Sequence, residues 1–204
     1  MSDKYKNCKV VVLGESGVGK TCLITRYVSD IYNDKTCSTN GATYASKTVD
    51  IDNVHLRFDI WDTAGQEKYR SLTKFFYKDA TIAILVYDIT RRASFEEVKT
   101  YWVEQIKTYG DKDIIIGIAG NKSDLFSEEE VHESEAEEFA STINAVFNLT
   151  SAYLNNGINE LFHSLGKKFL DPSYQVNGGK PQSGKIKLDK KKNTNKNGDK
   201  KKCC

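Results

Sequence analysis

Residues 14–21 read Gly-Glu-Ser-Gly-Val-Gly-Lys-Thr and have the types and spacing of a phosphate-binding loop. They match the pattern Gly-x-x-x-x-Gly-Lys-Ser/Thr between a predicted strand and a predicted helix. The glycines let successive backbone N–H groups converge on phosphate oxygens, and the start of the helix adds partial positive charge. Lys20 would neutralise the β- and γ-phosphates, and the Thr21 hydroxyl would bind Mg²⁺. We therefore expect nucleotide contacts from Ser16, Gly17, Val18, Gly19, Lys20, Thr21 and Cys22.

A second motif, Trp-Asp-Thr-Ala-Gly-Gln-Glu at residues 61–67, follows a predicted strand. Asp62 would hold Mg²⁺ through a water molecule, and the N–H of Gly65 would reach the γ-phosphate. Gln66 would be the catalytic residue, because its side-chain amide can orient the attacking water. In isolation the segment would suit equally well an aspartate that caps a helix near residue 67. Its position after a phosphate loop favours the catalytic interpretation.

The tetrapeptide Asn-Lys-Ser-Asp at residues 121–124 indicates which base is bound. Guanine presents an N1–H and an N2 amino group side by side, and the carboxylate of Asp124 can accept both hydrogen bonds. Adenine has no such donor pair, so we expect a discrimination of about 10⁴ between the two bases. Asn121 would tie this segment to the phosphate loop, and the stem of Lys122 would cover one face of the base. Alone, such a tetrapeptide is usually a polar turn. As the third motif in order, it makes the alternative interpretation, an ATPase or a nucleoside kinase, unfavourable.

Apolar runs of strand length alternate with segments of helix length. We predict strands at 8–13, 44–51, 54–61, 80–89, 114–119 and 145–149, and helices at 20–30, 94–109, 133–142 and 156–170. Asp52-Asn53 predicts a hairpin turn, and Ser94 with Glu97 three positions later predicts a helix N-terminus. The alternation predicts an α/β fold with a mostly parallel six-stranded sheet, one antiparallel edge strand and helices on both faces. Ligands then bind beyond the carboxyl ends of the strands, where all three motifs fall.

Charge is distributed unequally along the 204 residues. Residues 171–204 contain ten lysines and three aspartates, a formal charge of +7, which leaves −5 on residues 1–170. A mildly acidic body does not favour a nucleic-acid partner, whose basic residues would lie on the folded surface. We expect a nucleotide-binding domain at 1–170 and a flexible basic tail at 171–204, which has too few apolar residues to form a core.

The lack of a recognisable targeting signal and the spacing of the cysteines lead us to expect a cytosolic protein. We find neither an apolar signal segment nor a run of about 18 apolar residues, and so expect no membrane-spanning segment. The five cysteines have no paired spacing, which indicates reduced thiols rather than a disulfide framework.

The three motifs, in this order and spacing, resemble the small GTPases of the Ras superfamily over residues 6–170. The segments 61–62, 66–72, 75–80 and 85–90 are similar to signatures of its Rab family, and so is the double-cysteine ending. The resemblance implies a P-loop GTPase fold and a GTP/GDP switch that hydrolyses GTP with Mg²⁺. It also implies effector binding in the GTP form and a role in vesicle-mediated membrane traffic. A module that holds nucleotide without turning it over is the alternative, although the residues for hydrolysis are present.

The resemblance assigns further Mg²⁺ and guanine contacts. Thr39 matches a threonine that caps the γ-phosphate, which makes the Mg²⁺ ligands Thr21, Thr39 and Asp62. Tyr32 matches an aromatic residue that lies across the guanine. Thr36 and Asn40 depart from the residues usual in Rab proteins.

The loop after the last predicted strand matches the family's third base-contacting segment. Ser151 and Ala152 match residues of that loop, whose backbone N–H contacts guanine O6. Tyr153 stands where the family has lysine. Because the contact at Ala152 is made by the backbone, we expect base recognition to survive with altered packing around Tyr153.

The resemblance also implies an anchor and a set of partners. Cys203 and Cys204 would carry geranylgeranyl groups, and two chains with nearby lysines give stable membrane attachment. A lysine-rich ending can also serve solubility alone. The implied partners are effectors, an exchange factor, a GTPase-activating protein, and the prenylation and dissociation-inhibitor machinery. The protein would then cycle between the cytoplasm and the cytoplasmic face of endomembranes.

Overall fold

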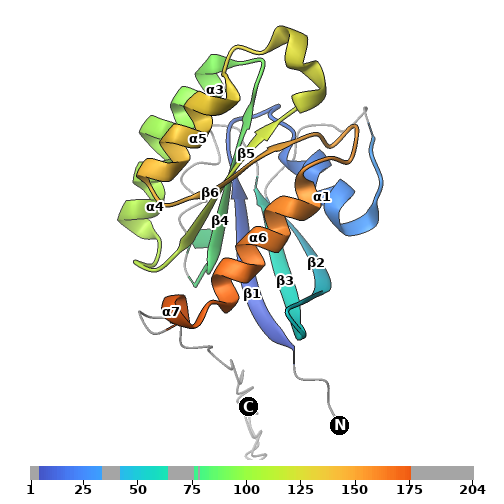
Figure 1. Cartoon of the computed structure of the whole chain (residues 1–204), viewed down its shortest axis with the longest axis vertical. Coiled ribbons are helices and arrows are strands. Elements are labelled where there is room, and N and C mark those ends of the chain that lie inside the picture. Colours follow the sequence, from blue (N-terminus) through green and yellow to red (C-terminus); the bar gives the residue numbers. More distant parts are fainter. Residues whose placement is uncertain (1–4, 34–41, 64–75, 78, 176–204) are drawn as a thin grey trace, which may run out of the picture.

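The computed structural model describes residues 5–33, 42–63, 76, 77 and 79–175. These residues form a six-stranded sheet in the order β2-β3-β1-β4-β5-β6 (Figure 1). The strands are β1 (Lys6–Leu13), β2 (Ala42–Ile51), β3 (Val54–Thr63), β4 (Ile82–Asp88), β5 (Ile115–Asn121) and β6 (Val146–Thr150). Neighbouring strands run parallel except for β2 and β3, which are antiparallel. The predicted α/β fold with one antiparallel edge strand is therefore confirmed.

The burial of the side chains in each strand agrees with the position of that strand in the sheet. Every residue of β4 is buried, as expected for a central parallel strand that is covered on both faces. β2 lies at the edge of the sheet, and all of its residues except Ile51 are at least partly exposed. Asp52 and Asn53 connect β2 to β3 with φ values of 49° and 62°, so both central residues of the turn have the positive φ of a type I′ hairpin.

Helices connect the parallel strands. Their bounds are α1 (Lys20–Ser29), α3 (Arg92–Glu97), η2 (Val98–Trp102), α4 (Val103–Tyr109), η3 (Ser123–Glu128), α5 (Glu133–Thr142), α6 (Ile158–Leu170) and α7 (Pro172–Gln175). α3, η2 and α4 form one continuous helical segment whose middle, η2, is a π-helical turn. None of the described helices combines the length and the apolar character needed to cross a membrane.

The helix predicted at 94–109 begins earlier than expected. It starts at Arg92 with Arg91 as the N-cap residue, so the assignment of Ser94 as the N-cap is wrong. The Ser94 hydroxyl instead accepts a hydrogen bond from the N–H of Asp88 at 3.0 Å and donates one to the carbonyl of Arg91 at 2.7 Å. Ser94 thus joins the first turn of the helix to the end of β4.

The core has two layers, one on each face of the sheet. One layer packs α1 and α6 against β1, β3 and β4, and Tyr27 of α1 stacks on Phe162 of α6 at 3.7 Å between ring centroids. The other layer packs α3, η2, α4 and α5 against β1, β4 and β5, around the buried Trp102 and Phe95. Figure 1 shows the two groups of helices on opposite sides of the sheet. This packing fixes the strand ends that carry the predicted site.

Candidate nucleotide site

The strand register brings the predicted site residues to one edge of the sheet. Val12, near the end of β1, pairs with Asp62 of β3, and Asp88 at the end of β4 pairs with Asn121 at the end of β5. Asn121 in turn pairs with Thr150 at the end of β6. All these strands run parallel, so their carboxyl ends meet at one edge, where α/β sheets bind ligands. The three motifs were predicted to meet there.

The phosphate loop, residues 14–19, curls around the side chain of Lys20. Lys20 is only 6% exposed, and its Nζ donates to the carbonyls of Gly14 and Glu15 at 2.8 Å each. Burial lowers the pKa of Lys20 to about 8, and the charge of Asp62 partly opposes this shift. The loop therefore holds a buried cation that an anionic ligand would stabilise.

Asn121 closes the loop from the side of β5. Its Nδ2 donates to the carbonyl of Val18 at 2.8 Å, and its Oδ1 accepts from the hydroxyl of Thr150 at 3.2 Å. Gly19 has φ 94°, and a Cβ there would collide with the Asn121 amide. A side chain at position 19 would therefore displace Asn121. The expected tie between Asn121 and the phosphate loop is present in the structure as the hydrogen bond to Val18.

Thr21, which is partly buried, and Asp62, which is buried, form an oxygen pair beside Lys20. The Thr21 hydroxyl donates to Oδ2 of Asp62 at 2.6 Å. Oδ1 of Asp62 is also buried and has no hydrogen-bond partner among the described residues. Burial raises the pKa of Asp62, while Thr21 and Lys20 act in the opposite direction. A buried carboxylate oxygen that lacks a donor fits a cation, and hydroxyl and carboxylate oxygens suit Mg²⁺.

A pocket of about 430 Å³ lies beyond the ends of β5 and β6. Its volume falls within the range of small-molecule sites. It is lined by Gly19, Cys22, Tyr32, Asn121, Lys122, Asp124, Leu125, Ala152 and Tyr153. Except for Ser151, the base contacts predicted from separate segments of the sequence thus line one pocket.

Hydrogen bonds hold the polar groups of this pocket. The Ser151 hydroxyl donates to Oδ1 of Asp124 at 2.5 Å and accepts from the N–H of Leu154 at 2.9 Å. Arg26 of α1 donates to the carbonyls of Ala152 and Tyr153 at 2.8 and 3.2 Å. α1, the helix that follows the phosphate loop, therefore also fixes the loop after β6.

Tyr153 contributes to the pocket differently from a lysine. Its ring meets that of Tyr32 edge to face at 5.4 Å between centroids, and the guanidinium of Arg26 lies 5.7 Å from the Tyr32 ring. The two tyrosines thus form an aromatic pair at the pocket wall. The sequence predicted altered packing at position 153 but could not name its partner.

Other predicted residues lie outside the part of the chain that the structure describes. They are Thr39, Gly65, Gln66, Cys203 and Cys204. Their roles stay predictions.

Two charged residues near the site were missed by the sequence reasoning. Asp88 is 1% exposed, and its Oδ2 lies 2.6 Å from Nζ of Lys122. Arg91 donates to the carbonyl of Ser16 in the phosphate loop at 3.1 Å. A polar residue at the end of an otherwise apolar run was a signal for Asp88, whereas nothing local distinguished Arg91 from its neighbour Arg92.

Comparison with known proteins decides the family. The model of the Ras family matches residues 9–171. This chain belongs to the Ras family. It is 43% identical to the GTP-binding protein ypt5 of Schizosaccharomyces pombe over 164 residues, which cover 79% of this chain and 77% of ypt5. It is 40% identical to the Ras-related protein Rab-22A of Homo sapiens over 178 residues, or 86% and 90% of the two chains. Over 203 residues it is 38% identical to the Ras-related protein Rab-5A of Dictyostelium discoideum, which covers 100% of this chain and 98% of that relative.

Within the Ras family, these relatives identify the chain as a Rab GTPase. As such it binds GTP and GDP, hydrolyses GTP, and acts as a switch in membrane traffic. The predicted family, fold and enzyme class are therefore confirmed.

Proposed function

We propose that this Rab GTPase binds GTP together with Mg²⁺ at the edge of the sheet where the parallel strands end, and exchanges protein partners when the γ-phosphate leaves. The observation that carries the proposal is the convergence of three chemically different groups. Lys20 is a buried cation, Thr21 with Asp62 is an oxygen pair, and Asp124 is a carboxylate at the wall of a pocket. Each group suits a different part of one guanine nucleotide.

The phosphate loop would bind the β- and γ-phosphates through its backbone and Lys20. The ammonium already has two carbonyl partners, and an ammonium group has three hydrogens to donate. The remaining N–H is available to a phosphate oxygen. Charge-assisted hydrogen bonds of this kind are stronger than neutral ones.

The Thr21–Asp62 pair would hold Mg²⁺. A hydroxyl has one hydrogen and two lone pairs, so Thr21 can bind a cation while it still donates to Asp62. Asp62 would act through a water molecule, and Thr39 is the third predicted ligand. When bound, Mg²⁺ neutralises charge on the phosphate oxygens.

Asp124 would select guanine. The hydrogen bond from Ser151 fixes the carboxylate and leaves it further acceptor positions for N1–H and the N2 amino group. Lys122 and Tyr32 line the same pocket and would cover the base, while the N–H of Ala152 would contact O6. Tyr153, as the edge-to-face partner of Tyr32, would hold that ring in place.

Hydrolysis by the protein alone should be slow. Gln66 would orient the attacking water, and Gly65 and Thr39 would respond to the loss of the γ-phosphate. The three motifs contain no arginine within residues 14–21, 61–67 and 121–124. An arginine from a GTPase-activating protein would therefore accelerate hydrolysis by about 10³ to 10⁵.

The tail would attach the protein to membranes, and protein partners would recognise its nucleotide state. Residues 1–170 would form the GTP-binding domain, and residues 171–204 a flexible tail that is prenylated at Cys203 and Cys204. Prenylation and dissociation-inhibitor proteins would then control cycling to the cytoplasmic face of endomembranes. Effectors, an exchange factor and a GTPase-activating protein would read the nucleotide state.

Removal of Mg²⁺ tests the site. Chelation with EDTA should speed the release of fluorescent GDP from wild-type protein, because the phosphates lose a neutralising charge. Asp62→Ala should release GDP faster than wild type in Mg²⁺ and respond much less to EDTA. A response of the variant equal to that of wild type would contradict the assignment of the Thr21–Asp62 pair.

A further inference from the structure

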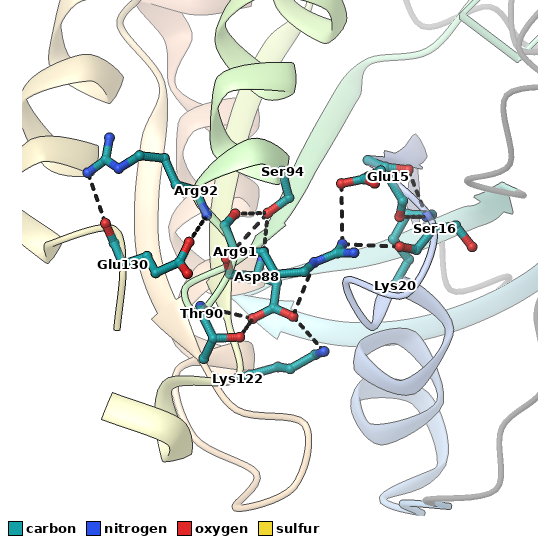
Figure 2. A network of polar contacts seen from close by, with 11 residues as sticks. Glu15, Ser16, Lys20, Asp88, Thr90, Arg91, Arg92, Ser94, Lys122 and Glu130 are labelled. Carbon is teal, nitrogen blue, oxygen red and sulfur yellow. Dashed lines mark hydrogen bonds and ion pairs between the residues drawn. The ribbon is translucent and has the colours of Figure 1, made fainter. Parts of the chain in front are cut away.

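A polar network joins the end of β4 to the phosphate loop and to the base-binding segment (Figure 2). At its centre is the buried carboxylate of Asp88. Its Oδ1 accepts from the N–H and the hydroxyl of Thr90 at 3.0 and 2.8 Å. Its Oδ2 lies 2.6 Å from Nζ of Lys122 and 3.7 Å from Nε of Arg91. One buried carboxylate thus holds two cations that lead to different parts of the nucleotide site.

Arg91 extends from Asp88 to the phosphate loop. Its Nη2 donates to the carbonyl of Ser16 at 3.1 Å and to Oε2 of Glu15 at 3.3 Å. The adjacent Arg92 points the other way in Figure 2. It donates to the carbonyl of Glu130 at 2.9 Å and to the carboxylate of Glu135 at 2.7 Å. Two neighbouring arginines therefore have different surroundings, and Arg91 is the one that contacts the loop.

The contact with Ser16 controls the direction of one peptide group. In a trans peptide the C=O and the following N–H point in opposite directions. A donor that binds the Ser16 carbonyl therefore turns the N–H of Gly17 to the side away from Arg91. Gly17 has φ 81°, and a Cβ there would meet no described atom within 4 Å, so no neighbour packs against the Cβ side of this residue. Glycine rotates readily, and the hydrogen bond from Arg91 favours one orientation.

The neighbouring carbonyls of the loop are held in a similar way. Lys20 binds those of Gly14 and Glu15, and Asn121 binds that of Val18. Lys20 and Asn121 belong to the sequence motifs, and Arg91 does not. Arg91 supplies the equivalent hydrogen bond at Ser16.

We propose that Arg91 is a positioning residue of the nucleotide site. It orients the Ser16–Gly17 peptide so that the Gly17 N–H is available to phosphate, while Asp88 connects this loop to Lys122 beside the base. The inference rests on the proposed function, since it requires that the loop binds phosphate. Arg91 acts on the nucleotide through the loop and is not itself a phosphate ligand.

The test compares nucleotide release from matched arginine variants of the full chain. Arg91→Ala should release fluorescent GDP roughly three- to tenfold faster than wild type, as expected for one charge-assisted hydrogen bond with partly exposed partners. Arg92→Ala removes the same charge from the next residue and should release GDP at the wild-type rate. Equal rates for Arg91→Ala and Arg92→Ala would overturn the inference.

A second measurement separates positioning from general destabilisation. GMP lacks the β-phosphate that GDP carries, so Arg91→Ala should weaken GDP binding more than GMP binding in a competition assay. A loss of stability without a positioning role would weaken both to the same extent, and that result would overturn the inference. Wild-type protein that binds no GDP would instead refute the proposed function itself.

Arg91→Lys distinguishes the guanidinium fork from its charge. Lysine keeps the charge near Asp88 but cannot reach Asp88 and the loop together with the same planar group. It should therefore release GDP faster than wild type and more slowly than Arg91→Ala. An Arg91→Lys variant that matches wild type would show that the fork has no role, and would overturn the assignment.

Discussion

The affinity for nucleotide should fall with rising pH, because Lys20 loses its proton more easily in the free protein than in the complex. In the free protein, burial lowers the pKa of Lys20 to about 8. Phosphate oxygens beside Nζ would raise this pKa, since a nearby negative charge favours the ammonium form. Above pH 8 the free protein must therefore take up a proton in order to bind, and the affinity decreases as the pH rises through the pKa of the free state.

The size of the effect follows from the titration of one group. With a pKa of about 8 in the free protein and a complex in which phosphate keeps Lys20 protonated over this pH range, the protonated fraction of free protein falls about threefold between about pH 7.5 and 8.5. The affinity for GDP should fall by the same factor. At pH 8.5, binding should take up about 0.8 proton per site.

Calorimetry in buffers of different ionisation enthalpy measures this proton uptake. The matched control is Lys20→Met, which has a side chain of similar length and no titrating group. Any titration of guanine itself is common to both proteins. Equal proton uptake by wild type and Lys20→Met would refute the reasoning, because Lys20 would then not be the group that the phosphates protonate.

Two further predictions concern segments outside the described residues. Gln66→Leu should bind GTP normally and hydrolyse it at least about tenfold more slowly, because the attacking water loses the amide that positions it. Phosphate release from preloaded protein, with and without an activating partner, measures this; rates equal to those of wild type would contradict the catalytic role. Replacement of Cys203 and Cys204 by serine should leave GDP binding intact and move the protein from the membrane fraction to the cytosol. Fractionation of cells tests this, and a variant that stays on membranes would place the anchor elsewhere.

The sequence predicted the parts of the fold that depend on local pattern. The apolar run at 80–89 and the turn at Asp52-Asn53 correspond to β4 and to the β2–β3 hairpin. The start of α3 was missed because the Ser94 hydroxyl contacts the end of β4, a tertiary contact that overrides the local capping signal. At this boundary a contact with a neighbour in space outweighs the local sequence pattern.

The site likewise contains residues that the sequence could predict and contacts that it could not. Lys20, Thr21, Asp62 and Asp124 were predictable because their chemistry depends on residue type at fixed spacing. The contact of Arg91 with Ser16 joins residues 75 positions apart and has no such spacing. The edge-to-face pair of Tyr32 and Tyr153 likewise depends on how α1 meets the loop after β6. Such contacts require the packed structure.

Nucleotide competition with Asp124→Asn tests the central claim most directly. Wild-type protein should prefer GTP to ATP by about 10⁴, since the carboxylate of Asp124 accepts from two guanine donors. Asp124→Asn should lose most of its affinity for GTP and gain affinity for xanthosine triphosphate, whose O2 accepts where guanine donates. Displacement of GTP from wild type by an equal concentration of ATP, or an unchanged preference for GTP in Asp124→Asn, would contradict the account.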